Sequence, residues 1–200
     1  MSVQFTLERT ADVVDALMAM NAQVLPSMTS RDHAAWVMNV LAHEVGPWLS
    51  RADCAGRALA RANGRDMNLT ARIAPGGYLA FDVDGPDLPD GRTYAPAAAI
   101  AVARLFGPSV HALAYAGPLA PRALWRIAAD GMAWGWTEQG ETRRGQDVLT
   151  SYGAPFANRQ LQWQTGEMVQ RGGCCRYVAV SGTFCAGCPL RKKATRPVRA

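Results

Sequence analysis

The chain has 200 residues, of which 49% are hydrophobic and 18% charged, and its formal net charge is +5. This length suits one domain, with room for a small terminal module, and the composition excludes a disordered chain. The first residues lack the pattern of a secretory signal, and Gly107-Pro108 and Gly117-Pro118 divide the most apolar region into pieces shorter than the ~18 residues of a membrane span. We therefore expect a cytoplasmic protein.

The first half of the chain predicts a strand, three helices and a hairpin. Val3, Phe5 and Leu7 alternate with polar residues, as in a short strand. Apolar residues at helical spacing, with Pro26 and Gly46-Pro47 as breaks, predict helices over three ranges: 10–25, 30–45 and 48–63. The ranges 67–74 and 78–83 are predicted to be strands, because Pro75-Gly76-Gly77 between them is typical of a hairpin turn.

The second half predicts further helices. They are expected over three ranges: 96–106, 121–132 and 141–149, with Trp134 and Trp136 after a glycine-broken end. The range 159–169 fits strand or helix equally well. We expect an α+β fold, mostly helical, with a small central antiparallel sheet and a C-terminal cysteine-rich segment. No glycine-rich phosphate-binding motif occurs, so nucleotide-dependent functions have no support.

Positive charge is concentrated in the last thirty residues. Residues 171–200 carry seven Lys and Arg and no acidic residue, which leaves −2 for residues 1–170. We divide the chain into an α+β docking domain (1–170), a cysteine segment (171–190) and a basic tail (191–200). The basic character is open to four interpretations: a nucleic-acid patch, a counter-charge for an anionic thiolate site, a surface for an acidic partner, or a solvated tail.

Four of the five cysteines lie in the cysteine segment. Cys174 and Cys175 are adjacent, nine residues follow, and Cys185 and Cys188 form a Cys-x-x-Cys before Pro189. Clustered thiols in a reducing compartment more often bind metal or do redox work than form disulfides. Four thiolates suit zinc or an iron–sulfur cluster, but structural zinc usually takes two separated Cys-x-x-Cys knuckles. Structural zinc and disulfides stay open as alternatives.

This arrangement resembles the C-terminal signature of the FhuF-type ferric siderophore reductases. The adjacent pair, the closing Cys-x-x-Cys and the Pro189 that follows match that family, although its spacer has ten residues and this one has nine. The resemblance covers about residues 171–190. It implies that Cys174, Cys175, Cys185 and Cys188 bind a [2Fe–2S] cluster through its iron atoms. Cys54 lies apart and is expected to be a core residue or a plain thiol.

The resemblance further implies a siderophore reductase, an oxidoreductase of iron acquisition that transfers one electron to a Fe(III)-siderophore and releases Fe(II). Its partners would be the ferric siderophore and an electron-donor protein or reductant, without nucleic acid, and the basic tail would permit peripheral contact with the inner membrane face. No catalytic side chain beyond the cluster is expected. Aromatic or basic residues are candidates for docking the chelate: Trp125, Trp134, Trp136, Trp163 and Arg126.

Two other functions fit the same residues. The protein would be an electron-transfer subunit of another enzyme if it has no siderophore site of its own, because the cluster motif would look the same. It would be a zinc-binding module if the basic tail contacts nucleic acid. The missing second knuckle and the lack of aromatic residues within the tail speak against the zinc module.

Overall fold

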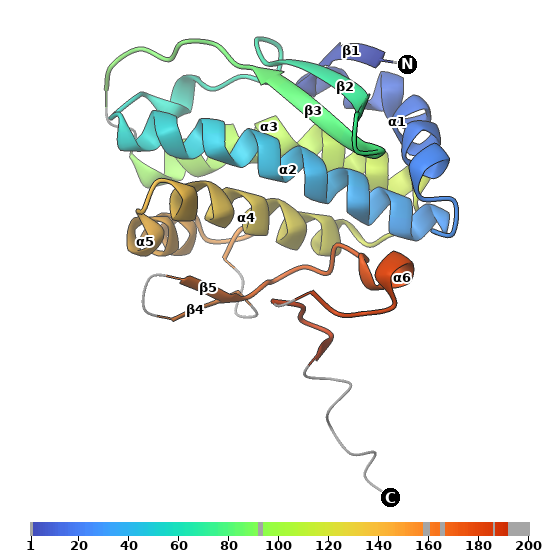
Figure 1. Cartoon of the computed structure of the whole chain (residues 1–200). Coiled ribbons are helices and arrows are strands. Elements are labelled where there is room, and N and C mark those ends of the chain that lie inside the picture. Colours follow the sequence, from blue (N-terminus) through green and yellow to red (C-terminus); the bar gives the residue numbers. More distant parts are fainter. Residues whose placement is uncertain (1, 92–93, 158–160, 165–166, 186, 192–200) are drawn as a thin grey trace, which may run out of the picture.

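A computed structural model describes residues 2–91, 94–157, 161–164, 167–185 and 187–191. Figure 1 shows a stack of layers: a sheet covers one side of the long helices α2 and α3, and helices α4 and α5 lie on the other side. The cysteine segment runs along the outer side of α4, away from the sheet. This is the α+β fold, mostly helical with a small antiparallel sheet, that the sequence predicts.

The sheet has three antiparallel strands in the order β1-β2-β3. They are β1 (Ser2–Thr6), β2 (Asn68–Ala74) and β3 (Tyr78–Asp84). The hairpin register pairs Ala74 with Tyr78, so the turn falls at Pro75-Gly76-Gly77 as predicted. Phe5 packs edge-on against Phe81 across the sheet, with ring centroids 6.3 Å apart. Alternate strand residues therefore face the helices and join the core.

Helix α1 (Thr10–Val24) agrees with prediction, whereas α2 (Ser30–Cys54) corrects it. The predicted break at Gly46-Pro47 is wrong, because α2 runs through Pro47. A proline costs a helix one hydrogen bond and normally breaks it. Here Gly46 lies so close to α4 that an added Cβ would be 2.2 Å from the Gly131 carbonyl oxygen. This helix contact keeps α2 continuous, and the predicted helix over 48–63 is replaced by the end of α2 and a 3-10 turn, Leu59–Arg61.

Helices α3 (Ala95–Ala116), α4 (Pro121–Glu138) and α5 (Thr142–Tyr152) complete the helical layers. The predicted ends at 106 and 132 are wrong: α3 continues through Pro108, and α4 through Gly131 and Gly135. Among the described helices α3 alone is long and apolar enough to cross a membrane, and half of its most apolar stretch is buried in the protein. Its buried Leu105 and Phe106 belong to the core.

Three short elements follow α5. Strands β4 (Gln162–Gln164) and β5 (Glu167–Gln170) pair antiparallel, so the ambiguous range 159–169 contains strand where the structure describes it. A single helical turn, α6 (Val178–Ser181), lies between the two cysteine pairs and was not predicted. The cysteine segment thus starts after β5 and is built mainly of turns, whose shape depends on what they pack against.

Candidate metal centre

Helix α4 holds the start of the cysteine segment through Asp130. The Asp130 side chain is fully buried, and its two carboxylate oxygens accept hydrogen bonds from Gly172 N (2.7 Å) and Gly173 N (2.8 Å). The Arg171 guanidinium lies 3.5 Å from the same carboxylate. Complete burial raises the pKa of Asp130 to about 6, although Arg171 and the two N–H groups favour the charged form. One carboxylate therefore fixes the backbone directly before Cys174.

Gly173 brings this backbone against α4. An added Cβ at Gly173 would lie 2.6 Å from Ile127 Cγ1 and 2.7 Å from Ile127 N. Real Cβ atoms do not come so close to a helix backbone, so only glycine permits this approach. The role of Gly173 is therefore this contact with α4.

Helix α2 holds the segment after the cysteine pair. Arg176 has a positive φ of 65°, which is uncommon for a residue with a side chain, and its guanidinium bonds the buried Asp32 carboxylate. Asp32 also closes the capping box of α2 with Thr29. Burial alone would raise the pKa of Asp32, but the hydrogen bonds from Arg176 and Thr29 hold it below its usual value. The Asp32 carboxylate therefore caps the start of α2 and also anchors the cysteine segment.

Two further contacts join the segment to α2. Arg171 donates to the side-chain oxygen of Asn39, and Tyr177 stacks on Trp36 with ring centroids 5.6 Å apart and planes 25° apart. The positive charge of Arg171 also acts on His43, whose pKa is lowered to about 4 mainly by burial. His43 is therefore neutral at physiological pH. Its Nδ1 contacts the Asn39 carbonyl oxygen, as expected of a structural histidine.

The four thiols of the segment are all free. Cys175 and Cys188 are buried, whereas Cys174 and Cys185 are half-buried. A turn in which Cys188 N donates to Cys185 O brings the second pair together. Burial, followed by repulsion from Cys175, raises the pKa of Cys185 to about 11. The pKa of Cys174 is also raised by burial, and then by Cys188 and Cys175.

These residues fit a group that binds four thiolates. In the described part of the chain no three Cys, His, Asp or Glu side chains are grouped tightly enough to hold a metal ion as they stand. The mutual effects on pKa nevertheless show that each of Cys174 and Cys185 feels Cys175 and Cys188. Neighbouring thiolates repel one another, and iron or zinc removes that cost by deprotonating and binding them. The segment supplies four thiol donors, and their binding of a metal group stays a prediction.

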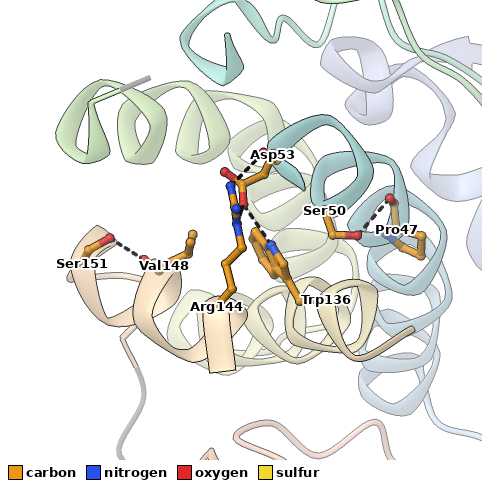
Figure 2. A network of polar contacts seen from close by, with 7 residues as sticks. All are labelled: Pro47, Ser50, Asp53, Trp136, Arg144, Val148 and Ser151. Atoms are coloured by element: carbon orange, nitrogen blue, oxygen red, sulfur yellow. Dashed lines mark hydrogen bonds and ion pairs between the residues drawn. The ribbon is translucent and has the colours of Figure 1, made fainter. Parts of the chain in front are cut away.

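The residues predicted to dock a chelate are scattered. Trp136 is fully buried, and its Nε1 donates to Asp53 (3.1 Å), which also pairs with Arg144 (2.7 Å), as Figure 2 shows. Trp136 is thus a core residue, and its docking role is ruled out. Trp125 packs edge-on against Phe156, and the side chain of Trp163 lies outside the described residues. Trp134 is 40% exposed, and its Nε1 donates to Glu138.

Among the candidates whose side chains the structure describes, Arg126 is the one that shares a cavity with a cysteine. It lines a cavity of about 210 Å³ together with Cys174. Two larger hollows, of about 640 and about 890 Å³, lie on the sheet and beside α3, and no cysteine of the described residues lines either. Cys54 is exposed at the end of α2 and is therefore the plain thiol, not the core residue, of the two predicted alternatives.

No known family, curated protein or solved structure matches this chain. The likeness to the FhuF-type reductases therefore rests on the cysteine motif itself.

Proposed function

We propose that this protein is a ferric siderophore reductase that holds a [2Fe–2S] cluster through Cys174, Cys175, Cys185 and Cys188. The observation that supports this proposal is that four free thiols belong to one segment, which Asp130 of α4 and Asp32 of α2 anchor, and that Cys174 and Cys185 are each influenced by Cys175 and Cys188. Such a cluster supplies one electron at a time. The substrate is Fe(III) in a chelate, which gains that electron and becomes Fe(II), an ion that siderophores bind far less well.

The residues around the thiols favour an electron-carrying site. Arg176 favours the charged form of Cys174 and Arg171 that of Cys185, although each arginine is itself paired with a carboxylate. Asp130 and Asp32 hold both arginines in place, and Asp130 also fixes the Gly172–Gly173 backbone. No acid–base step is needed. The side chains around the thiols therefore act by positioning the cysteine segment and by balancing its charge. We further propose that the protein acts in the cytoplasm or at the inner membrane face.

The test is the metal content and the visible and spin-resonance spectra of the anaerobically purified protein. We expect a red-brown protein with about two iron and two sulfide per chain. Cys174→Ser and Cys188→Ser each abolish or alter the spectrum, whereas Cys54→Ser, which changes an exposed thiol at the end of α2, leaves it unchanged. A colourless protein with one zinc would refute the proposal, and loss of colour in Cys54→Ser would refute the ligand assignment.

Turnover separates the reductase from an electron-transfer subunit. The purified protein is mixed with a ferric siderophore and a chemical reductant, and a ferrous-specific chelator traps the product. A reductase accelerates the appearance of Fe(II) over many turnovers. A protein with the correct spectrum and no such acceleration would instead be an electron-transfer subunit that serves another enzyme.

A further inference from the structure

The cavity beside Cys174 lies where three parts of the chain meet. It is lined by Arg31 and Ala35 of α2, by Ala123 and Arg126 of α4, and by the loop around Cys174. The remaining lining residues are Leu119, Gly172, Gly173, Arg176, Pro189 and Leu190. Cys174 is thus the only one of the four predicted ligands that lines this cavity. A molecule in it would lie against the cysteine site.

The described lining is positively charged, and no carboxylate is among its residues. Of its three arginines, Arg176 is paired with Asp32. Arg31 and Arg126 have no carboxylate partner among the described residues, so their charge is unbalanced. Arg31 also lies in the first turn of α2, where the helix dipole disfavours a cation. No described carboxylate therefore neutralises either charge, and the charge of Arg31 does not stabilise its helix.

The size of the cavity limits what enters. Cavities that enclose a drug-sized ligand measure roughly 300–1,000 Å³, whereas one of roughly 150 Å³ holds a benzene ring. At about 210 Å³ this cavity accommodates one ring-sized arm of a larger molecule. The apolar side chains of Ala35, Leu119 and Leu190 suit the carbon face of such an arm. Guanidinium groups suit paired anionic oxygens such as those of a carboxylate or catecholate.

From this geometry we propose that the cavity binds one arm of an anionic ferric chelate, built from catecholate or carboxylate groups, through Arg31 and Arg126. The inference rests on the proposed function and names its substrate class. Each turnover places one electron on the ferric ion, which becomes ferrous, and a one-electron donor such as a reduced ferredoxin-type protein or dithionite supplies it. Neutral and cationic hydroxamate chelates lack the negative charge that the two arginines require.

The test is binding of gallium(III) chelates, which resemble the ferric ones in charge and size but are not reduced. Titration calorimetry compares a trianionic gallium tricatecholate with a neutral gallium trihydroxamate on the purified, metal-loaded protein. We expect the wild type to prefer the anionic complex, and added salt to weaken this preference. Arg31→Gln and Arg126→Gln should each weaken binding of the anionic complex about tenfold and leave binding of the neutral one unchanged.

Arg143→Gln is the matched control, because Arg143 is an exposed arginine of α5 that does not line the cavity. It should bind both complexes as the wild type does. Far-UV circular dichroism and the visible spectrum establish that each variant is folded and loaded. Unchanged affinity of both cavity variants for the anionic complex, or a wild-type preference for the neutral one, would overturn the inference.

Binding and turnover can fail separately. If the arginine variants lose the gallium complex while the wild type reduces no ferric chelate, the binding site is supported and the proposed function falls. If the wild type reduces ferric chelates but the arginine variants bind both gallium complexes normally, the function is supported and this inference falls.

Discussion

Asp130 is the residue on which the shape of the cysteine segment depends most. Its buried carboxylate bonds two consecutive main-chain N–H groups and faces Arg171. A buried carboxylate with such partners gains several hydrogen bonds, but it also pays a desolvation cost. Nothing in the sequence around Asp130 indicates this role, because its partners are more than forty residues away. It is a positioning residue for the four thiols.

Stability should depend on pH through Asp130. Its pKa is raised to about 6 in the folded protein, above the value of an exposed Asp, so the folded state binds a proton more tightly than the unfolded state. The contribution of Asp130 to the free energy of unfolding is therefore fully present below about pH 4 and is lost as pH rises through about 6. Urea unfolding of the wild type and Asp130→Asn, between about pH 4 and about pH 7, measures the difference. A difference that does not change with pH would contradict the raised pKa.

Gly173→Ala should prevent the segment from docking on α4. The new Cβ would meet Ile127 Cγ1 at 2.6 Å and Ile127 N at 2.7 Å, and the backbone of a helix cannot move aside. We expect loss or change of the visible spectrum with an unchanged helical circular dichroism signal. Gly182→Ala is the control, since a Cβ there meets no atom within 4 Å and only the positive φ of 67° is strained, at about 1 kcal/mol. Equal spectra for the two variants would refute the close contact.

Among the elements, α2 and α4 form the platform that carries the site. Gly46, Gly131 and Gly135 let the two helices approach: a Cβ at Gly131 would lie 2.4 Å from the Ala42 carbonyl carbon, and one at Gly135 would lie 2.5 Å from the Gly46 carbonyl oxygen. Each helix contributes one carboxylate that bonds the cysteine segment: Asp32 from α2 and Asp130 from α4. The spacing of the helices therefore sets the spacing of the anchors.

Two helical glycines should respond oppositely to alanine. Gly131→Ala inserts a methyl group between α2 and α4 and should lower the free energy of unfolding by about 3 kcal/mol, the upper end for overpacking. Gly107→Ala in α3 meets no atom within 4 Å and should raise it by about 0.5–1 kcal/mol, because alanine favours a helix over glycine. Chemical denaturation measures both. Stabilisation by Gly131→Ala would show that α2 and α4 are not in close contact.

The sequence predicts the elements better than their ends. The three strands of the main sheet, the hairpin turn and the starts of α1 to α5 follow from periodicity, turn residues and caps, all of which act locally. By local rules Pro47 and Pro108 predict helix ends, but both lie inside helices. Their local cost is outweighed by packing of α2 and α3 into the core, and this packing involves residues far apart in the chain.

The same limit applies to the site. The cysteine motif identifies the four thiols without a structure. The residues that hold them could not be predicted, because Asp32 and Asn39 lie 144 and 132 residues from their arginine partners. Neither acid stands out in the sequence. Asp32 is the third residue of a capped helix and Asp130 is an acid within an apolar helix, and both are common positions for an acidic residue. Only the packing of the cysteine segment shows that both acids also hold that segment in place.

In the whole molecule the hydrophobic core is formed without the thiols. The sheet and helices α1 to α5 supply the core cluster, and no cysteine belongs to it. Cys175 and Cys188 are buried only where the segment lies on the platform. A metal group bound by these thiols would therefore stabilise a segment outside the core cluster, unlike the metal of a zinc finger, on which folding of the domain depends.

Removal of the metal should leave the helical domain folded. We expect the double variant Cys174→Ser/Cys188→Ser to lose visible absorption, to keep its far-UV circular dichroism and to unfold cooperatively in urea. Amides of the cysteine segment should exchange hydrogen faster in this variant, whereas those of α2 and α4 should not. Collapse of the helical signal would show that the metal centre contributes to folding of the core.

The placement of the anchors has a consequence for biosynthesis. Asp32, Asn39 and Asp130 all precede the four thiols in the chain, so the ribosome completes the platform before it makes the segment that docks there. Domains tend to fold from their N-terminal parts as they are synthesised. The new thiols therefore meet a finished binding surface, which shortens the time during which they are open to oxidation or to the wrong metal.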